Sequence, residues 1–206
     1  MEHMALRPAH VEPSSLAHIA QRAATTCPAG AEELQITGAT VDSRDVQPGD
    51  LFGAFPGLKV HGATFAAQAV AAGASAILTD AAGAELVSTT SPHTPVVIAD
   101  DARVAMGEAA ALIYGDPSTH LVFVGVTGTN GKTTTSYFID NALAQVHPHR
   151  GIMGTVELRV RGEAIESPRT TVEAPVLHGL LARMLEPRNR SLATTHGYRI
   201  YGPAAA

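Results

Sequence analysis

Two glycines, a lysine and a threonine stand close together in Gly128–Thr134, the segment GTNGKTT. Glycines let a backbone curl tightly enough for its amides to approach a phosphate, and amides at the start of a helix point toward such an anion. Gly128 and Gly131 would supply the curl, and the Lys132 ammonium group would neutralise β- and γ-phosphate oxygens. The Thr133 hydroxyl would complete the shell of a magnesium ion that the nucleotide oxygens mostly fill. The segment therefore predicts a site for a nucleoside triphosphate with Mg²⁺.

The residues on either side predict the elements that would hold this turn. Leu121–Val126 is a short apolar run rich in β-branched residues, which predicts a buried strand. From Lys132 onward, a helical spacing places four apolar residues on the predicted buried side: Tyr137, Phe138, Ile139 and Leu143. The general phosphate-loop pattern has glycine five residues before Gly131, where this chain carries Val126. The order of strand, glycine-rich turn and helix still favours phosphate binding over a turn that binds nothing.

The composition limits what else the chain can do. It has 206 residues, of which 45% are hydrophobic and 16% charged, so it can bury a core. The formal net charge is −5 and the basic residues are dispersed, which gives no surface for nucleic acid or an anionic membrane. The single cysteine, Cys27, excludes an internal disulfide. No stretch has the length of a membrane span and the start lacks the features of a signal peptide, so we expect a cytoplasmic protein. We also expect a monomer, although no residue pattern tests this.

Strands and helices alternate through the first part of the chain. The predicted strands are Leu34–Val41, Leu51–Phe55, Ala76–Thr79 and Val96–Ala99. The predicted helices are Ser15–Ala24, Phe65–Ala72 and Asp101–Tyr114, with a polar connection before Val96. This alternation predicts a compact α/β domain over residues 1–120.

The predicted phosphate-binding strand opens a second unit over residues 121–186. A strand near Ile152–Val156 and a hairpin of Leu158–Val160 with Glu163–Ile165 are predicted, followed by a helix that begins near Pro175. Its apolar stripe consists of Val176, Leu177, Leu180, Leu181, Met184 and Leu185. Residues 187–206 show no sustained period, so we expect an atypical tail without packing of its own.

The GTNGKTT segment resembles the ATP loop of the Mur ligases, the enzymes that build the peptide of bacterial peptidoglycan. Three further stretches are similar to this family: Ala39–Gly57, Gly151–Thr155 and Arg169–Pro175. The resemblance implies the α/β class, with an N-terminal UDP-binding α/β domain followed by the first part of a P-loop (Rossmann-like) ATPase domain.

The resemblance also implies site residues. ATP with Mg²⁺ would be held by the loop residues, with Lys132 in a catalytic role and Thr133 as metal ligand: Gly128, Thr129, Asn130, Gly131, Lys132, Thr133 and Thr134. Ser43 and the Leu58-Lys59-Val60 loop would meet the uridine diphosphate, and Thr170 and Thr171 would contact the UDP-muramoyl substrate. From spacing alone, the simpler interpretation of the Asp42-Ser43-Arg44 loop is an Asx turn in which Asp42 caps its own backbone.

The implied reaction is ATP-dependent addition of the third amino acid, a diamino acid, to UDP-N-acetylmuramoyl-L-alanyl-D-glutamate through an acyl phosphate. The run Thr170-Thr171-x-Glu173-Ala174-Pro175 favours this member over the sister ligase that adds D-Ala-D-Ala. Because the resemblance covers only the front of such an enzyme, we expect a truncated form without ligase activity alone. Three alternatives stay open: a non-catalytic UDP-sugar or nucleotide-binding fragment, a frameshifted remnant, and the sister ligase. Lysine and diaminopimelate both stay open as the added amino acid.

Overall fold

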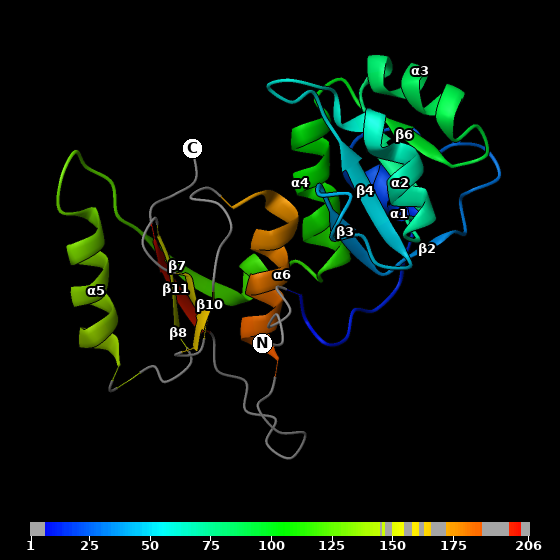
Figure 1. The fold of residues 1–206 in the computed structure, drawn as a ribbon. Helices are drawn as coiled ribbons and strands as arrows, with labels where there is room; N and C mark the ends of the chain where they lie inside the picture. Colours follow the sequence, from blue (N-terminus) through cyan, green and yellow to red (C-terminus); the bar gives the residue numbers. More distant parts are fainter. Residues whose placement is uncertain are drawn as a thin grey trace. The chain divides into compact units, whose positions relative to one another are not determined.

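The computed structural model describes residues 7–144, 146, 150–154, 158–160, 163–165, 172–186 and 198–202. The chain divides into two compact units: His10–Gly115 forms one, and Met1–Ala9 with Asp116–Ala206 forms the other. Each unit has its own main sheet (Figure 1). Each also has its own cluster of buried hydrophobic residues. Among the described residues, no helix has the length and apolar character needed to cross a membrane.

A four-stranded parallel sheet forms the centre of the His10–Gly115 unit, which confirms the predicted α/β class. Its strands follow the chain order: β3 Gly38–Thr40, β4 Asp50–Ala54, β5 Ala76–Thr79 and β6 Val96–Ile98. Every residue of β3, β4 and β5 is buried, so both faces of the sheet are covered. Because parallel strands end at the same side, the loops after these strands meet at the carboxyl edge of the sheet.

The helices of this unit are α1 Leu16–Arg22, the 3₁₀ helix η1 Gly62–Phe65, α2 Ala66–Ala71, α3 Ala81–Thr90 and α4 Ala102–Ile113. The helices η1 and α2 lie between β4 and β5, and α3 lies between β5 and β6, whereas α1 precedes the sheet strands and α4 follows them. A two-residue strand, β1 Ser14–Ser15, precedes α1 and pairs antiparallel with β2 Gln35–Ile36. Both α3 and α4 begin after an aspartate whose carboxylate accepts a hydrogen bond from an amide of the first turn: Asp80 from Gly83 N (2.7 Å) and Asp101 from Val104 N (3.0 Å). The sequence therefore fixes both helix starts by side-chain caps.

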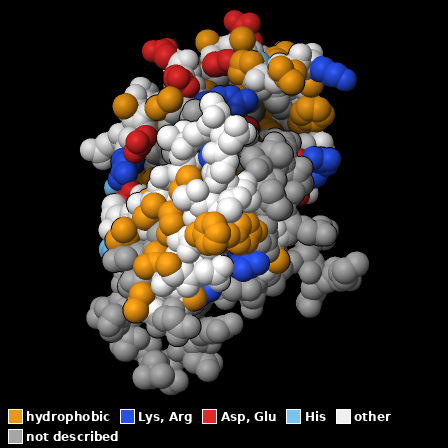
Figure 2. Space-filling model, turned by 90° about the vertical axis from the view of Figure 1, so that its left-hand side faces the viewer, with side chains coloured by type: hydrophobic (Ala, Val, Ile, Leu, Met, Phe, Trp, Pro, Cys, Tyr) orange, Lys and Arg blue, Asp and Glu red, His pale blue; other side chains and the backbone are white. Residues whose placement is uncertain are grey.

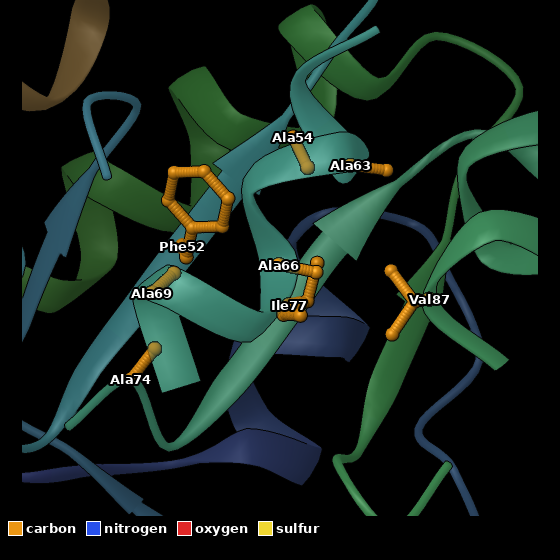
Figure 3. Packing of buried hydrophobic residues seen from close by; sticks show 8 residues of the cluster. All are labelled: Phe52, Ala54, Ala63, Ala66, Ala69, Ala74, Ile77 and Val87. Carbon is orange, nitrogen blue, oxygen red and sulfur yellow. The ribbon is translucent and has the colours of Figure 1, made fainter. Parts of the chain in front are cut away.

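A cluster of buried hydrophobic residues joins this sheet to η1, α2 and α3 (Figure 3): Phe52, Ala54, Ala63, Ala66, Ala69, Ala74, Ile77 and Val87. Most members are alanine, which lets the helices approach the strands closely. Phe52 of β4 is the largest fully buried side chain of the cluster. The packing of this cluster therefore depends on one aromatic ring surrounded by small residues.

The second unit contains a five-stranded sheet in the order β10 Glu163–Ile165, β9 Leu158–Val160, β8 Arg150–Met153, β11 Tyr198–Gly202 and β7 Leu121–Gly125. The pairs β7–β11 and β11–β8 are parallel, whereas β8–β9 and β9–β10 are antiparallel. The helices are η2 Pro117–His120, α5 Lys132–Leu143 and α6 Ala174–Leu185. The buried apolar stripe of α6 joins the hairpin and β7 in one cluster: Leu121, Leu158, Val160, Ile165, Leu180, Leu181 and Met184.

Two predictions for the first unit are wrong. The single strand predicted at Leu34–Val41 is two strands, because Gln35–Ile36 pairs antiparallel with β1 whereas Gly38–Thr40 pairs parallel with β4. The polar connection predicted before β6 contains α3. Only Gly83 and Val87 of α3 are buried, so the helix carries no apolar stripe that would predict it.

The prediction for the burial of β7 is also wrong, and Tyr198–Gly202 within the predicted tail forms a strand. The tail supplies β11, which pairs with β7 and β8, and partners so distant in the sequence leave little local signal. The predicted buried strand β7 has Val122 and Phe123 50% and 46% exposed. The reason is that β7 lies at the edge of the described sheet and has a neighbouring strand on one side only.

The buried side predicted for α5 is wrong at Phe138, whereas Tyr137, Ile139 and Leu143 are half-buried. Phe138 is 70% exposed, whereas Ser136 and Asp140 are buried. Viewed from the side of α5, the surface carries exposed hydrophobic side chains (Figure 2). The inward face of α5 is polar because Ser136 donates to the Lys132 carbonyl oxygen (2.9 Å) and Asp140 accepts from Arg150 Nε (2.6 Å).

Replacing Phe52 with alanine tests whether the His10–Gly115 core depends on this ring. Phe52 is 1% exposed, so Phe52→Ala leaves a cavity and should lower the free energy of unfolding by about 3–5 kcal/mol. Phe65 is 45% exposed, and the same change there should cost about 1 kcal/mol or less. Urea denaturation followed by circular dichroism measures both values, and equal losses would contradict the assignment of the core.

Candidate functional site

The turn between β7 and α5 has the backbone shape that a phosphate loop requires. Gly128 has φ 151° and Gly131 has φ 78°, a region that only glycine enters without strain. Gly131 is the residue directly before α5, so its conformation turns the chain into the helix. Residues 127–131 are exposed. The two glycines therefore occupy the positions where the sequence predicts a curled main chain.

The start of α5 leaves backbone amides open. In the described part of the chain, the first main-chain hydrogen bond here runs from Thr135 N to Gly131 O (2.9 Å). No side chain caps this helix start. The amides of residues 132–134 therefore have no main-chain acceptor among the described residues, and they lie at the positive end of the helix dipole.

Lys132 lies at the same turn. Its Nζ atom donates a hydrogen bond to the carbonyl oxygen of Gly128, and its side chain is half-buried. The ammonium group is thereby held beside the open amides and does not point into a core. Thr133 and Thr134 are exposed on the first turn of α5, so the Thr133 hydroxyl is accessible to a metal ion. This arrangement can bind an anion with several phosphate oxygens.

An ion pair fixes the helix that carries these amides. Arg150 Nε donates to Asp140 Oδ1 at 2.6 Å, which links α5 to β8. The Asp140 side chain is 4% exposed and the Arg150 side chain 22% exposed, so the pair is largely removed from water. Sequence reasoning missed this pair, because its signal would have been only an Asp and an Arg ten residues apart.

The loop after β3 contains Ser43. The Asp42 carboxylate accepts from the Arg44 amide (3.0 Å) and from Arg44 Nε (2.8 Å), which is the Asx turn that the simpler interpretation predicts. Ser43 is buried, and its hydroxyl donates to Gln68 Oε1 at 3.1 Å. In this conformation the Ser43 oxygen can accept a hydrogen bond from a ligand, while its proton is engaged by α2.

The loop after β4 contains Lys59. Its base is closed by a bridge between Pro56 and His61 and by a hydrogen bond from Gly57 N to Val60 O (3.1 Å). Leu58 is fully exposed, and Lys59 is exposed beside it. Since β3 and β4 are paired neighbours, the Ser43 loop and the Lys59 loop follow adjacent strands at one sheet edge.

Sequence reasoning missed the contact that ties this loop to the next strand. His61 Nε2 lies 3.1 Å from Asp80 Oδ1, directly after β5. The pKa of Asp80 lies below its ordinary value, first because the Gly83 amide donates to the carboxylate and then because His61 does. Nothing local joins positions 61 and 80; the only signal is that each follows a predicted strand.

The other predicted substrate residues, Thr170 and Thr171, lie outside the described residues. The phosphate loop lies in one unit, and Ser43 and Lys59 lie in the other. Within their own unit, Ser43 and Lys59 lie in loops that follow paired neighbouring strands.

Comparison with protein families matches both units. The family described as Mur ligase family, catalytic domain, matches residues 35–115, and the one described as Mur ligase middle domain matches residues 126–194. The chain belongs to the Mur ligase family. The second match includes the whole GTNGKTT turn, and the first includes the loops that carry Ser43 and Lys59. The resemblance predicted from the sequence is therefore confirmed.

Comparison with individual Mur ligases shows how similar this chain is to members of the family. The UDP-N-acetylmuramoyl-L-alanyl-D-glutamate--2,6-diaminopimelate ligase of Streptomyces avermitilis is 47% identical over 180 residues, which are 87% of this chain and 35% of the relative. The ligase of the same name from Streptomyces coelicolor is 45% identical over 187 residues, 91% of this chain and 36% of the relative. A solved structure of a ligase of this name superposes with a TM-score of 0.70 at 24% identity, over 93% of this chain and 36% of that one, which supports the fold. The chain thus spans about a third of the length of these relatives.

The Asp140–Arg150 pair should be the ion pair on which stability depends most. Asp140→Ala leaves the Arg150 guanidinium without its partner in a largely buried place, and should lower the free energy of unfolding by about 3 kcal/mol or more. Glu108 pairs with Arg22 at 2.8 Å, but these side chains are 50% and 39% exposed, so Glu108→Ala should cost about 1 kcal/mol or less. Chemical denaturation of the two variants compares the losses. A larger loss in the Glu108 variant would contradict the positioning of α5 by this pair.

Proposed function

We propose that this chain is part of an ATP-dependent ligase of peptidoglycan precursor synthesis. In this proposal the ligase joins 2,6-diaminopimelate to UDP-N-acetylmuramoyl-L-alanyl-D-glutamate. The choice of diaminopimelate is supported by the names of the relatives from the two Streptomyces species. Because the chain spans about a third of their length, the activity is proposed for a protein of the relatives' extent. Both ATP and UDP-linked precursors are cytoplasmic metabolites, so the proposed place of action is the cytoplasm.

The observation that carries the ATP site is the set of open amides beside the Lys132 ammonium group. A triphosphate needs several donors converging on its oxygens and one cation near the β- and γ-phosphates. The exposed turn of Gly128, Thr129, Asn130 and Gly131 would wrap the phosphates, and the amides of 132–134 would complete the contact. On ATP binding, the Lys132 ammonium would exchange the Gly128 carbonyl oxygen for phosphate oxygens. The residues present therefore fit the cofactor.

Magnesium would be held at the same turn. Thr133 carries an exposed hydroxyl on the first turn of α5, a position from which it can complete an octahedral shell. Among the described residues, no group of three or more His, Cys, Asp or Glu is placed to hold a metal ion. Thr133 is thus the protein oxygen that we assign to the metal in this part of the chain. When bound, the ion would neutralise the negative charges of the ATP triphosphate and of the substrate carboxylate, which otherwise repel each other.

The UDP-muramoyl substrate would bind at the carboxyl edge of the parallel sheet. Open α/β sheets bind ligands there, because loops from adjacent strands converge. Lys59 would supply charge to the diphosphate and Ser43 a hydroxyl oxygen, while Gln68 holds the Ser43 side chain in place. Thr170 and Thr171 are assigned to the same substrate by family resemblance.

The two lysines of the chain, Lys59 and Lys132, allow a matched test of both sites. Methionine keeps the unbranched side chain of lysine but removes its charge. Lys132→Met should weaken Mg-ATP binding about 30- to 150-fold, as expected for loss of hydrogen bonds to a charged group worth about 2–3 kcal/mol. Its affinity for UDP should stay within about twofold. Lys59→Met should leave Mg-ATP binding within about twofold and weaken UDP binding. The loss of UDP affinity should be only about three- to fivefold, because this lysine is exposed.

Isothermal titration calorimetry of the purified chain with Mg-ATP and, separately, with UDP measures these affinities. The wild-type chain should bind both ligands. Loss of ATP affinity in the Lys59 variant, or unchanged ATP affinity in the Lys132 variant, would contradict the assignment of the two sites. A wild-type chain that binds neither ligand would contradict the proposed function as a whole.

A further inference from the structure

The loop that carries Lys59 is closed at its base but has an exposed tip. Gly62 N donates to Phe55 O at 2.7 Å, which draws together the two ends of the segment. A Cβ atom at Gly62 would lie 2.9 Å from Phe55 N, so the close approach depends on glycine. Leu58 and Val60 are 107% and 52% exposed on either side of Lys59. The tip therefore has little packing of its own, and its shape depends on what holds the base.

His61 holds this base through both nitrogens of its imidazole. Nδ1 accepts a hydrogen bond from the Ala63 amide (3.0 Å) at the start of η1. Because Nδ1 is an acceptor, the proton of the neutral ring is on Nε2, which donates to Asp80 Oδ1 at 3.1 Å. The His61 side chain is 15% exposed, so water competes little for these bonds.

Asp80 is in turn fixed by the helix that it caps. Its Oδ1 atom also accepts from Gly83 N at 2.7 Å, at the first turn of α3. A Cβ atom at Gly83 would lie 2.6 Å from His61 Cε1 and 1.9 Å from Thr79 Oγ1. Thr79 Oγ1 itself donates to Ala54 O, the last residue of β4. The imidazole is therefore packed against the backbone of α3 as well as bonded to its cap.

We propose that His61 is a positioning residue for the diphosphate of the substrate, holding the Lys59 loop in its binding shape by joining it to Asp80. This inference rests on the proposed function, since it needs a diphosphate at the carboxyl edge of the sheet. Its physical basis is preorganisation. A loop that already has the binding conformation does not pay for ordering when the ligand arrives, whereas a loop that has it for a tenth of the time binds about tenfold more weakly.

Two substitutions of His61 separate the bond to Asp80 from the cap on η1. His61→Ala removes both. His61→Asn keeps an oxygen that can accept from the Ala63 amide, as in an Asx turn, but is too short to reach Asp80. Both variants should bind UDP about three- to fivefold more weakly than wild type, as predicted for Lys59→Met, with greater picosecond–nanosecond motion of the Gly57–Val60 amides in ¹⁵N relaxation. The Asn variant should keep a melting temperature closer to wild type than the Ala variant.

Ser15→Ala is the matched control. It removes the cap of α1, where Ser15 Oγ accepts from the His18 amide (3.3 Å), and so lowers the stability of the same unit without touching the loop. Its UDP affinity should stay within about twofold of wild type. If weaker UDP binding came from a general loss of stability, all three variants would show it. If it comes from positioning by His61, only His61→Ala and His61→Asn should show it.

Titration calorimetry with UDP decides the matter. Weaker binding confined to the two His61 variants, with mobile loop amides, supports the proposal. If His61→Asn binds UDP as tightly as wild type while His61→Ala binds it more weakly, the effect comes from the η1 cap and the role of Asp80 is overturned. If His61→Ala also binds UDP as tightly as wild type, the whole proposal is overturned, while the substrate assignment stands. A wild-type chain that binds Mg-ATP but no UDP overturns the substrate assignment and this inference with it.

Discussion

The Lys132 ammonium group lies against the carbonyl oxygen of Gly128, beside backbone amides that have no main-chain acceptor among the described residues. Open donors at a helix start are costly unless water or an anion satisfies them. Glycine is required at 128 and 131 because residues with a side chain adopt the positive φ angles found there only with strain in the backbone. The Asp140–Arg150 pair then fixes the helix that carries the donors. The phosphate site is thus built from main-chain geometry, with one cation.

In the His10–Gly115 unit, the residues available to a ligand lie in loops and not in the strands. Its central strands are buried on both faces, so they contribute no accessible polar side chain, and chemistry is displaced to the loops at the carboxyl edge. Ser43, Lys59 and His61 all lie in loops that follow β3 or β4. A loop that recognises a ligand must be held in one conformation. Gln68 holds the loop after β3 through Ser43, and Asp80 holds the loop after β4 through His61. Both supports come from residues distant in the sequence.

The parts of this architecture that sequence could predict are those with local signals. Strands alternating with helices predict the α/β class, and spacing within seven residues predicts the phosphate turn. The helix α3 has too few buried residues to show a period. Apolar spacing wrongly predicts that Phe138 of α5 faces inward, because the buried positions of this helix carry Ser136 and Asp140 with their polar bonds. The His61–Asp80 contact and the place of β11 depend on tertiary pairing, which no short segment encodes.

The most direct test of the phosphate site is the response of its amides to a polyphosphate. In ¹⁵N–¹H spectra of the purified chain, titration with Mg²⁺ and tripolyphosphate should move the amide signals of Gly128–Thr134 more than any others, and downfield, because each amide gains a charged acceptor. Tripolyphosphate lacks a base and a sugar, so the shifts report phosphate contact alone. If these amides stay unchanged while signals elsewhere move, the turn does not bind phosphate and the account of this site is wrong.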